Sequence, residues 1–264
     1  MKLFSDYHSH PQAHKLQPYT AALLDPWSDA ARSKGLTDIA VTDHDRYHAG
    51  VDFDAIAAWR ERNPDLRLRA GIELDNDPET AAAGRDWVER NWDRLDFVLG
   101  SVHYFAGKDK MFDSADQAGQ FAERPIEAIY RDYIAQVEAM IARGHIDCLS
   151  HLDLVKIHKF RPPSTSPGGA LPFFEGLLQQ IKRADLAMEI NTAGWRKPVG
   201  EQYPEEAILR RAVELGIPLT FSSDAHSHFQ LAEDYPRLTA LVEKLGVKEV
   251  AIFERHRRTL VPLK

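Results

Sequence analysis

Two histidines spaced two apart near the N-terminus, His8 and His10, are well suited to bind a metal ion. Leu3 and Phe4 precede them, so we expect a short buried strand that runs into a loop. Residues two apart on a strand point to the same side, which directs both imidazoles one way. Neutral imidazole is a good ligand for zinc, iron or manganese. The pair therefore predicts a divalent metal, provided that further ligands come from elsewhere in the chain.

Further metal-ligating side chains follow other apolar runs. Seven short apolar runs alternate with amphipathic stretches, and six of them lead into a His, Glu or Asp. We expect each run to be a buried strand. After the first, the predicted strands are Leu36–Thr42, Leu66–Leu74, Leu95–Val102, His145–Ser150, Leu186–Ile190 and Ile217–Ser222, and a terminal run, Val247–Phe253, predicts one more strand without such residues.

The stretches between the strands carry helix signals. Asp25-Pro26 and Asp77-Pro78 each place a capping side chain before a proline, which predicts a helix start. Pro204 is expected to open a helix that Gly216 ends. The longest predicted helix is Asp116–Arg143. Alternating strands and helices predict an α/β fold with parallel strands and crossover helices.

In a closed β/α barrel the carboxyl ends of the strands meet at one face, where active sites lie. The potential ligands would then share one site. One ion takes about four to six ligands, so nine candidates predict two or three ions, with Glu73 able to bridge two of them. Asp43 and Asp45 flank His44 and are either carboxylates that orient its imidazole or turn residues. The nine candidates are His8, His10, His14, His44, Glu73, His103, His151, Asp224 and His226.

Composition narrows the class of protein. The 264 residues contain no linker, so residues 1–264 are predicted to be one domain, and the Pro/Gly/Ser-rich segment 161–170 is predicted to be an active-site loop. The net charge of −7 is spread along the chain, which argues against a nucleic-acid partner. No apolar run is long enough for a membrane partner, and the sequence does not determine the oligomeric state. The single cysteine, Cys148, is expected to be buried, and with the missing signal segment it favours the cytoplasm.

Other common catalytic motifs are absent from the sequence. There is no GxGxxG after a strand, no GxxxxGK[ST] and no GxSxG. The chemistry therefore has to come from the histidines and carboxylates.

The ordered motifs resemble those of the PHP (polymerase and histidinol phosphatase) family along essentially the whole chain. They are HxH at the first strand, TDH at the second, a lone Glu at the third, GSVH at the fourth, SH at the fifth and DAH at the last. The resemblance implies a distorted (β/α)7 TIM-like barrel whose tri-metal cluster hydrolyses phosphoesters. It also implies three metal sites, formed by His8, His10, Glu73 and Asp224, by Glu73, His103 and His151, and by His14, His44 and His226.

Two loops resemble the histidinol-phosphate phosphatase branch of that family, namely Glu189–Lys197 with Tyr203-Pro204, and His151–Lys156. The resemblance implies hydrolysis of L-histidinol phosphate to L-histidinol and phosphate in histidine biosynthesis. The expected mechanism is attack by metal hydroxide, with Glu73, His8, His10 and Asp224 as the catalytic ligands. Lys156 and Arg161 compete for one phosphate-binding role, beside Arg196, while Tyr104, Phe105 and Trp195 either stack on the substrate imidazole or pack the loops.

Three alternatives stay open. A PHP enzyme that acts on another small phosphoester or on nucleic acid would carry the same ligands. An amidohydrolase-type metal hydrolase also begins with HxH on a barrel strand, but its usual bridging lysine has no counterpart here, since Glu73 takes that place. A non-enzymatic domain that merely retains metal is the third.

Overall fold

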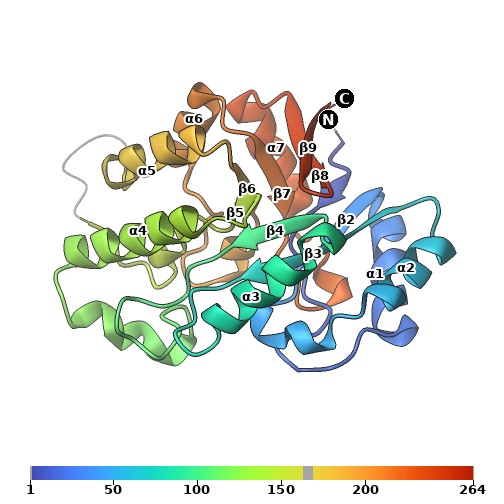
Figure 1. The fold of residues 1–264 in the computed structure, drawn as a ribbon. Coiled ribbons are helices and arrows are strands. Elements are labelled where there is room, and N and C mark those ends of the chain that lie inside the picture. Colours follow the sequence, from blue (N-terminus) through green and yellow to red (C-terminus); the bar gives the residue numbers. More distant parts are fainter. Residues whose placement is uncertain (1, 163–168, 264) are drawn as a thin grey trace.

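The computed structural model describes residues 2–162 and 169–263, so residues 163–168 of the predicted active-site loop lie outside the described part. Seven strands form one parallel sheet in sequence order (Figure 1). The sheet closes on itself, because the Tyr7 N–H donates to the Phe221 carbonyl (2.9 Å) and the His10 N–H to the Ala225 carbonyl (2.8 Å). The predicted TIM-like barrel is therefore confirmed. Its strands are β1 (Ser5–Asp6), β2 (Asp38–Val41), β3 (Arg67–Leu74), β4 (Phe97–Gly100), β5 (Cys148–Leu149), β6 (Ala187–Asn191) and β7 (Leu219–Ser222).

Helices alternate with these strands and cover the outside of the barrel (Figure 1). Each buries an apolar stripe against the sheet, as α6 does with Ile208, Leu209 and Ala212. Gly216 ends α6 in the left-handed conformation (φ 65°), as predicted. The helices are α1 (Ala21–Lys34), α2 (Phe53–Arg62), α3 (Ala81–Asn91), α4 (Ile126–Arg143), α5 (Leu171–Arg183), α6 (Glu206–Leu215) and α7 (Tyr235–Leu245). No helix in these ranges is long and apolar enough to cross a membrane.

Two predicted helix starts are displaced. The Asp25-Pro26 prediction is wrong, because α1 already begins at Ala21, where the Thr20 hydroxyl accepts from the Leu23 N–H (3.3 Å). Pro26 lies inside the helix, where it has no N–H to donate to the preceding turn. Burial of the helix face against the barrel offsets this missing hydrogen bond. Asp77 does cap a turn, since its carboxylate accepts from the Glu79 N–H (2.9 Å), but α3 itself begins later.

The predicted helix Asp116–Arg143 is also wrong in its extent. A 3₁₀ segment, Ala115–Ala122, precedes α4, and Pro125 separates the two in an extended conformation (ψ 138°). Proline has no N–H to donate and disfavours helix in the residue before it. The terminal run Val247–Phe253 does form a strand, β8 (Glu249–Glu254), which pairs antiparallel with β9 (Arg257–Pro262) outside the barrel sheet.

The β8–β9 hairpin helps to fill the end of the barrel opposite the predicted ligands. The ring of Phe253 packs 4.9 Å from that of Phe97 and 6.3 Å from that of Tyr7. The Tyr7 hydroxyl accepts from the Phe253 N–H (3.0 Å) and donates to Asp38 (2.9 Å). Cys148 belongs to the same cluster and is fully buried, as predicted. Because this end of the barrel is packed with apolar side chains, the potential metal ligands lie at the other end, where the strands have their carboxyl ends.

His256 fastens the hairpin turn to the barrel. One ring nitrogen donates to Asp147 (2.8 Å) and the other to the Trp92 carbonyl (2.9 Å), while the ring stacks on Trp92 at 3.5 Å. Two acceptors facing both nitrogens require the doubly protonated imidazolium. Burial is the largest influence and opposes that charge, but the hydrogen bond and charge of Asp147, with the Trp92 carbonyl and Asp96, together outweigh it and raise the pKa of His256 above its usual value.

We therefore expect the contribution of His256 to stability to depend on pH. With a raised pKa in the folded state, the stabilisation is complete below the unfolded-state pKa of about 6.5 and is lost as pH rises through the higher folded-state pKa. His256→Gln should lower the unfolding free energy by about 1–2 kcal/mol at pH 6 and by less at pH 9. Urea unfolding of both proteins at the two pH values measures this, and an equal loss at both would contradict the imidazolium assignment.

Candidate metal centre

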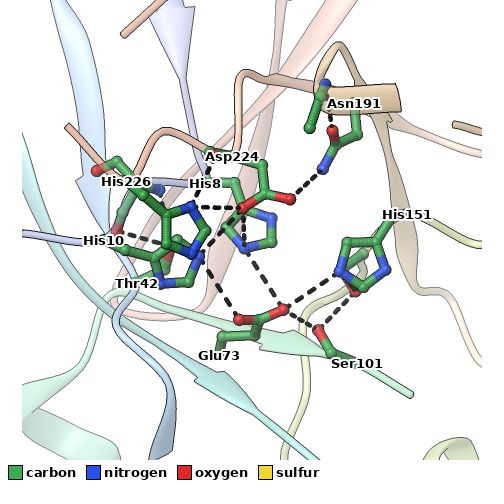
Figure 2. A network of polar contacts seen from close by, with 12 residues as sticks. His8, His10, Thr42, Glu73, Ser101, His151, Asn191, Asp224 and His226 are labelled. Atoms are coloured by element: carbon green, nitrogen blue, oxygen red, sulfur yellow. Dashed lines mark hydrogen bonds and ion pairs between the residues drawn. The ribbon is translucent and has the colours of Figure 1, made fainter. Parts of the chain in front are cut away.

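The carboxyl ends of the strands bring the nine predicted ligands to one face of the barrel. His8 and His10 follow β1, and Asp224 and His226 follow β7. Barrel closure therefore places these two ligand pairs side by side, although they are far apart in the sequence (Figure 2). Parallel bridges continue past the named strands at Ser9–Ala225 and at His44–Glu73. These extensions carry the ligands beyond the sheet into a shared cavity.

Glu73 lies at the middle of the group and is 1% exposed. Its Oε1 lies 3.4 Å from the Nε2 atoms of both His8 and His151, and its Oε2 lies 2.8 Å from His44 Nδ1. The Ser101 hydroxyl donates to Oε1 at 2.6 Å (Figure 2). Burial alone would raise the pKa of Glu73, but the surrounding histidines, His44, His8 and His151, together outweigh it and hold that pKa well below its usual value. The side chain is therefore a carboxylate with partners on both oxygens.

The structure forms four groups whose ligand atoms lie within 4.8 Å of one another. Two of these groups match sets that the family resemblance implies. One is the group of His8, His10 and Asp224, which lacks only Glu73, and the other is the group of Glu73, His103 and His151. The implied third set differs, because His10 rather than His14 joins His44 and His226; the ring of His14, an exposed residue, instead lies tilted 4.3 Å from that of His226. The groups are His8, His10 and Asp224; Glu73, His103 and His151; His10, His44 and His226; and His44, Asp75 and His103.

Polar contacts at the far side of the rings orient three of these imidazoles, two by hydrogen bonds and that of His103 by an ion pair. His8 Nδ1 lies 3.0 Å from Glu189, His103 Nδ1 lies 3.0 Å from Asp75, and His226 Nδ1 lies 3.1 Å from the Asp224 carbonyl. An N–H on Nδ1 leaves the lone pair on Nε2, as in metal sites where a carboxylate orients a ligand histidine.

Several imidazole nitrogens of the cluster have no hydrogen-bond partner in the described part of the chain. The buried Nε2 atoms of His8, His10 and His226 have no hydrogen-bond partner among the described residues. Buried polar atoms without partners are costly in a protein core, and a set of imidazole and carboxylate donors accepts divalent zinc, iron or manganese. The residues present therefore fit divalent metal ions.

Electrostatics within the cluster keep lone pairs available on two of the imidazoles. Burial and the neighbouring His226 and His44 lower the pKa of His14 to about 4. Burial and His226 likewise hold the pKa of His10 well below its usual value. At neutral pH these imidazoles are therefore unprotonated, which is the state that binds metal.

Sequence analysis did not assign Glu189 and Asp75. Asp75 follows Glu73 by two residues at the end of β3, and Glu189 precedes Asn191 by two on β6, so the alternation of strand side chains was the available signal. Asp43 and Asp45, which flank His44, lie outside hydrogen-bond distance of the ligand imidazoles. Asp43 accepts from the Tyr19 hydroxyl (2.7 Å) and lies 3.9 Å from His10, and Asp45 packs against Gly84.

The three cations predicted to hold phosphate are occupied elsewhere. The ammonium of Lys156 is 1% exposed and lies 2.8 Å from Asp153. Arg161 pairs with Glu201 and Glu205 through its two terminal guanidinium nitrogens. Arg196 donates to the Ser223 carbonyl (2.6 Å) and lies 3.2 Å from Glu233. The ion pairs of Arg161 and Arg196 join loops that are distant in sequence, so local motifs could not reveal them.

The cavity above the ligands has walls from the loops that follow β4, β5 and β6. Among the described lining residues, Lys197 is the one lysine or arginine. It is exposed and forms no ion pair with a described residue. None of the three aromatic residues considered for stacking on the substrate is among the described lining residues. Phe105 is buried and stacks on Phe112 at 4.5 Å, Tyr104 is buried and donates to Asp77, and Trp195 lies beneath the Arg237 guanidinium. The lining is His14, His44, Glu73, His103, Met111, Asp113, His151, Leu154, Ile157, Ala193, Lys197, Tyr203, Asp224 and His226.

Residues 6–193 of this chain match the PHP domain family. A probable histidinol-phosphatase of Deinococcus radiodurans is 32% identical over 255 residues, covering 88% of this chain and 90% of the relative. A histidinol-phosphatase of Lactococcus lactis is 23% identical, covering 84% and 85%.

Solved structures share the fold. The Lactococcus lactis histidinol phosphate phosphatase, in complex with zinc, L-histidinol and phosphate, has a TM-score of 0.75 at 20% identity and covers 97% of this chain and 98% of that one. A putative histidinol phosphatase of Listeria monocytogenes has a TM-score of 0.73 at 21% identity and covers 88% and 99%.

The orienting carboxylates give a test of the metal centre. Glu189→Gln should weaken metal retention about 10- to 100-fold, because the amide is a poorer acceptor for the His8 N–H. Competition with a chelator, followed by elemental analysis of the protein, measures this. Glu249→Gln, the same change at an exposed glutamate at the start of β8, is the matched control. Equal metal retention in the two variants would contradict the role given to Glu189.

Proposed function

Because this chain belongs to the PHP domain family, we propose that it is a metal-dependent phosphomonoesterase that hydrolyses L-histidinol phosphate to L-histidinol and inorganic phosphate. The observation that carries the reaction class is the buried ligand cluster around Glu73. The substrate is supported by the histidinol-phosphatase relatives, one of which matches at 32% identity over most of both chains. A solved structure with the same fold holds zinc, L-histidinol and phosphate.

We assign two or three divalent ions, zinc, iron or manganese, to this cluster. His8, His10 and Asp224 would hold one ion and His103 and His151 a second, with Glu73 shared between them. His44 and His226 would hold a third, with His10 or His14 completing it. Such ions lower the pKa of bound water toward neutrality and neutralise phosphoryl charge.

The chain's own residues prepare the site for this chemistry. Glu189 and Asp75 fix the orientation of His8 and His103, so little rearrangement is needed on binding. We assign contact with the outer phosphate oxygens to Lys197. Lys156, Arg161 and Arg196, which sequence analysis nominated for that contact, instead brace the loops through their ion pairs.

The same proposal covers the setting of the reaction. Its substrate is a small phosphorylated molecule, with neither nucleic acid nor membrane as partner, and its place is histidine biosynthesis in the cytoplasm. The free, buried thiol of Cys148 suits a reducing compartment.

Substrate preference is the direct test. We expect kcat/KM for L-histidinol phosphate to exceed that for phosphoserine and p-nitrophenyl phosphate by at least about tenfold under one metal condition, which is about 1.4 kcal/mol of transition-state discrimination. The three substrates are compared by phosphate release. Phosphatase activity without this preference would leave a phosphomonoesterase for another substrate.

Glu73 tests the shared carboxylate. Glu73→Gln should lower kcat by at least about a hundredfold and reduce the number of bound ions, since a neutral amide cannot compensate two cations. Elemental analysis of the wild-type protein should find more than one divalent ion per chain. Near-normal kcat and metal content in the variant would rule out the bridging role.

A further inference from the structure

One wall of the cavity carries a carboxylate that the metal centre does not use. Asp113 lies in the loop between β4 and α4 and lines the cavity. Its Oδ1 is buried without a hydrogen-bond partner, and the side chain forms no ion pair with a described residue. Asp113 also belongs to none of the four groups suited to a metal ion. Its position therefore calls for a different partner.

The backbone around Asp113 is held firmly. The preceding Phe112 is fully buried, its N–H donates to the His103 carbonyl (2.9 Å), and its ring packs 5.8 Å from that of Tyr133. His103 is itself one of the proposed ligands. The carboxylate is thus fixed relative to the metal centre by a short, buried connection.

Part of the cavity that Asp113 lines is apolar. Met111, Leu154 and Ile157 line the same cavity, and so does the buried hydroxyl of Tyr203, which also lacks a partner. A carboxylate oxygen buried beside apolar groups is costly unless an N–H or O–H donor reaches it. A phosphate is excluded there by like charge. An organic cation with N–H donors and an apolar body satisfies both requirements.

We propose that Asp113 binds the cationic N–H group of the substrate and so determines specificity for phosphate esters that carry a cation. The inference rests on the proposed function. With the phosphate at the metal ligands and Lys197, the organic part of the substrate extends toward Asp113 and the apolar wall. L-Histidinol phosphate offers two such N–H donors, its ammonium group and its imidazole. Both have the chemistry that this wall requires.

The test is Asp113→Asn, which keeps the shape of the side chain and removes its charge. We expect kcat/KM for L-histidinol phosphate to fall about 30-fold or more, mainly through KM, because a charge-assisted contact to the substrate is lost. For p-nitrophenyl phosphate, which has no cation, the change should stay within about twofold. Binding of the product L-histidinol, measured by calorimetry, should weaken in parallel, which gives a readout independent of turnover.

Two analogues separate the donors. 3-(Imidazol-4-yl)propyl phosphate lacks the ammonium group, and L-phenylalaninol phosphate lacks the imidazole. If Asp113 receives the ammonium group, the effect of the substitution disappears with the first analogue, and if it receives the imidazole, the effect disappears with the second. Either result supports the proposal.

Controls keep the result specific. Asp109→Asn makes the same change at an exposed residue of the same loop and should behave as wild type. Elemental analysis should show equal metal content in all variants, and Asp113→Glu should retain part of the preference for cationic substrates.

Equal loss on all four phosphate esters, or an unchanged kcat/KM for L-histidinol phosphate, would overturn the role of Asp113. Failure of the proposed function has a different signature, namely a wild-type enzyme without preference for L-histidinol phosphate. In that case, comparing phosphate esters that carry a cationic group with p-nitrophenyl phosphate, which carries none, still tests Asp113.

Discussion

Glu73 places a negative charge on a side chain that is 1% exposed, and the site is built around compensating that charge. Four imidazole nitrogens, from His8, His10, His44 and His151, lie within 3.6 Å of its two oxygens. These imidazoles come from the ends of three different strands, so the compensation exists only when the barrel has formed. Burial makes each of these interactions stronger than it would be in water. The same burial makes the loss of any one partner costly.

Closure of the barrel is the element that makes this possible. The hydrogen bonds between β1 and β7 bring His8 next to Asp224, although almost the whole chain separates them. The opposite end of the barrel is filled by Tyr7, Phe97 and Phe253, the last of which comes from the β8–β9 hairpin. One end of the barrel is therefore apolar and packed, and the polar groups gather at the other. This division allows a stable core and a strained, charge-rich site to coexist in one small barrel.

The strand-end ligands could be predicted from the sequence because their spacing follows the period of a strand. Glu189 and Asp75 follow the same period, but they orient histidines instead of facing the cavity, and only the three-dimensional arrangement distinguishes these roles. The cations could not be assigned from sequence for a different reason. Whether an arginine is free depends on acidic residues that approach it from other loops, as Glu205 approaches Arg161. The start of α1 was misjudged because another capping residue, Thr20, lies a few residues before the predicted one.

The ion pairs behind the cavity wall have their own consequence for function. Lys156, Asp153 and Glu201 join the loops that follow β5 and β6, and Arg161 extends the connection to Glu205. Buried ion pairs often add little net stability, because desolvation opposes their attraction. They do restrict geometry, since breaking one leaves a buried charge without a partner. Tyr203 lies beneath the Lys156 ammonium, 5.3 Å from ring to nitrogen, so the network holds a cavity wall in place. Phosphoryl transfer depends mainly on positioning and on charge, and a wall held in this way serves positioning even where it contributes little to the free energy of folding.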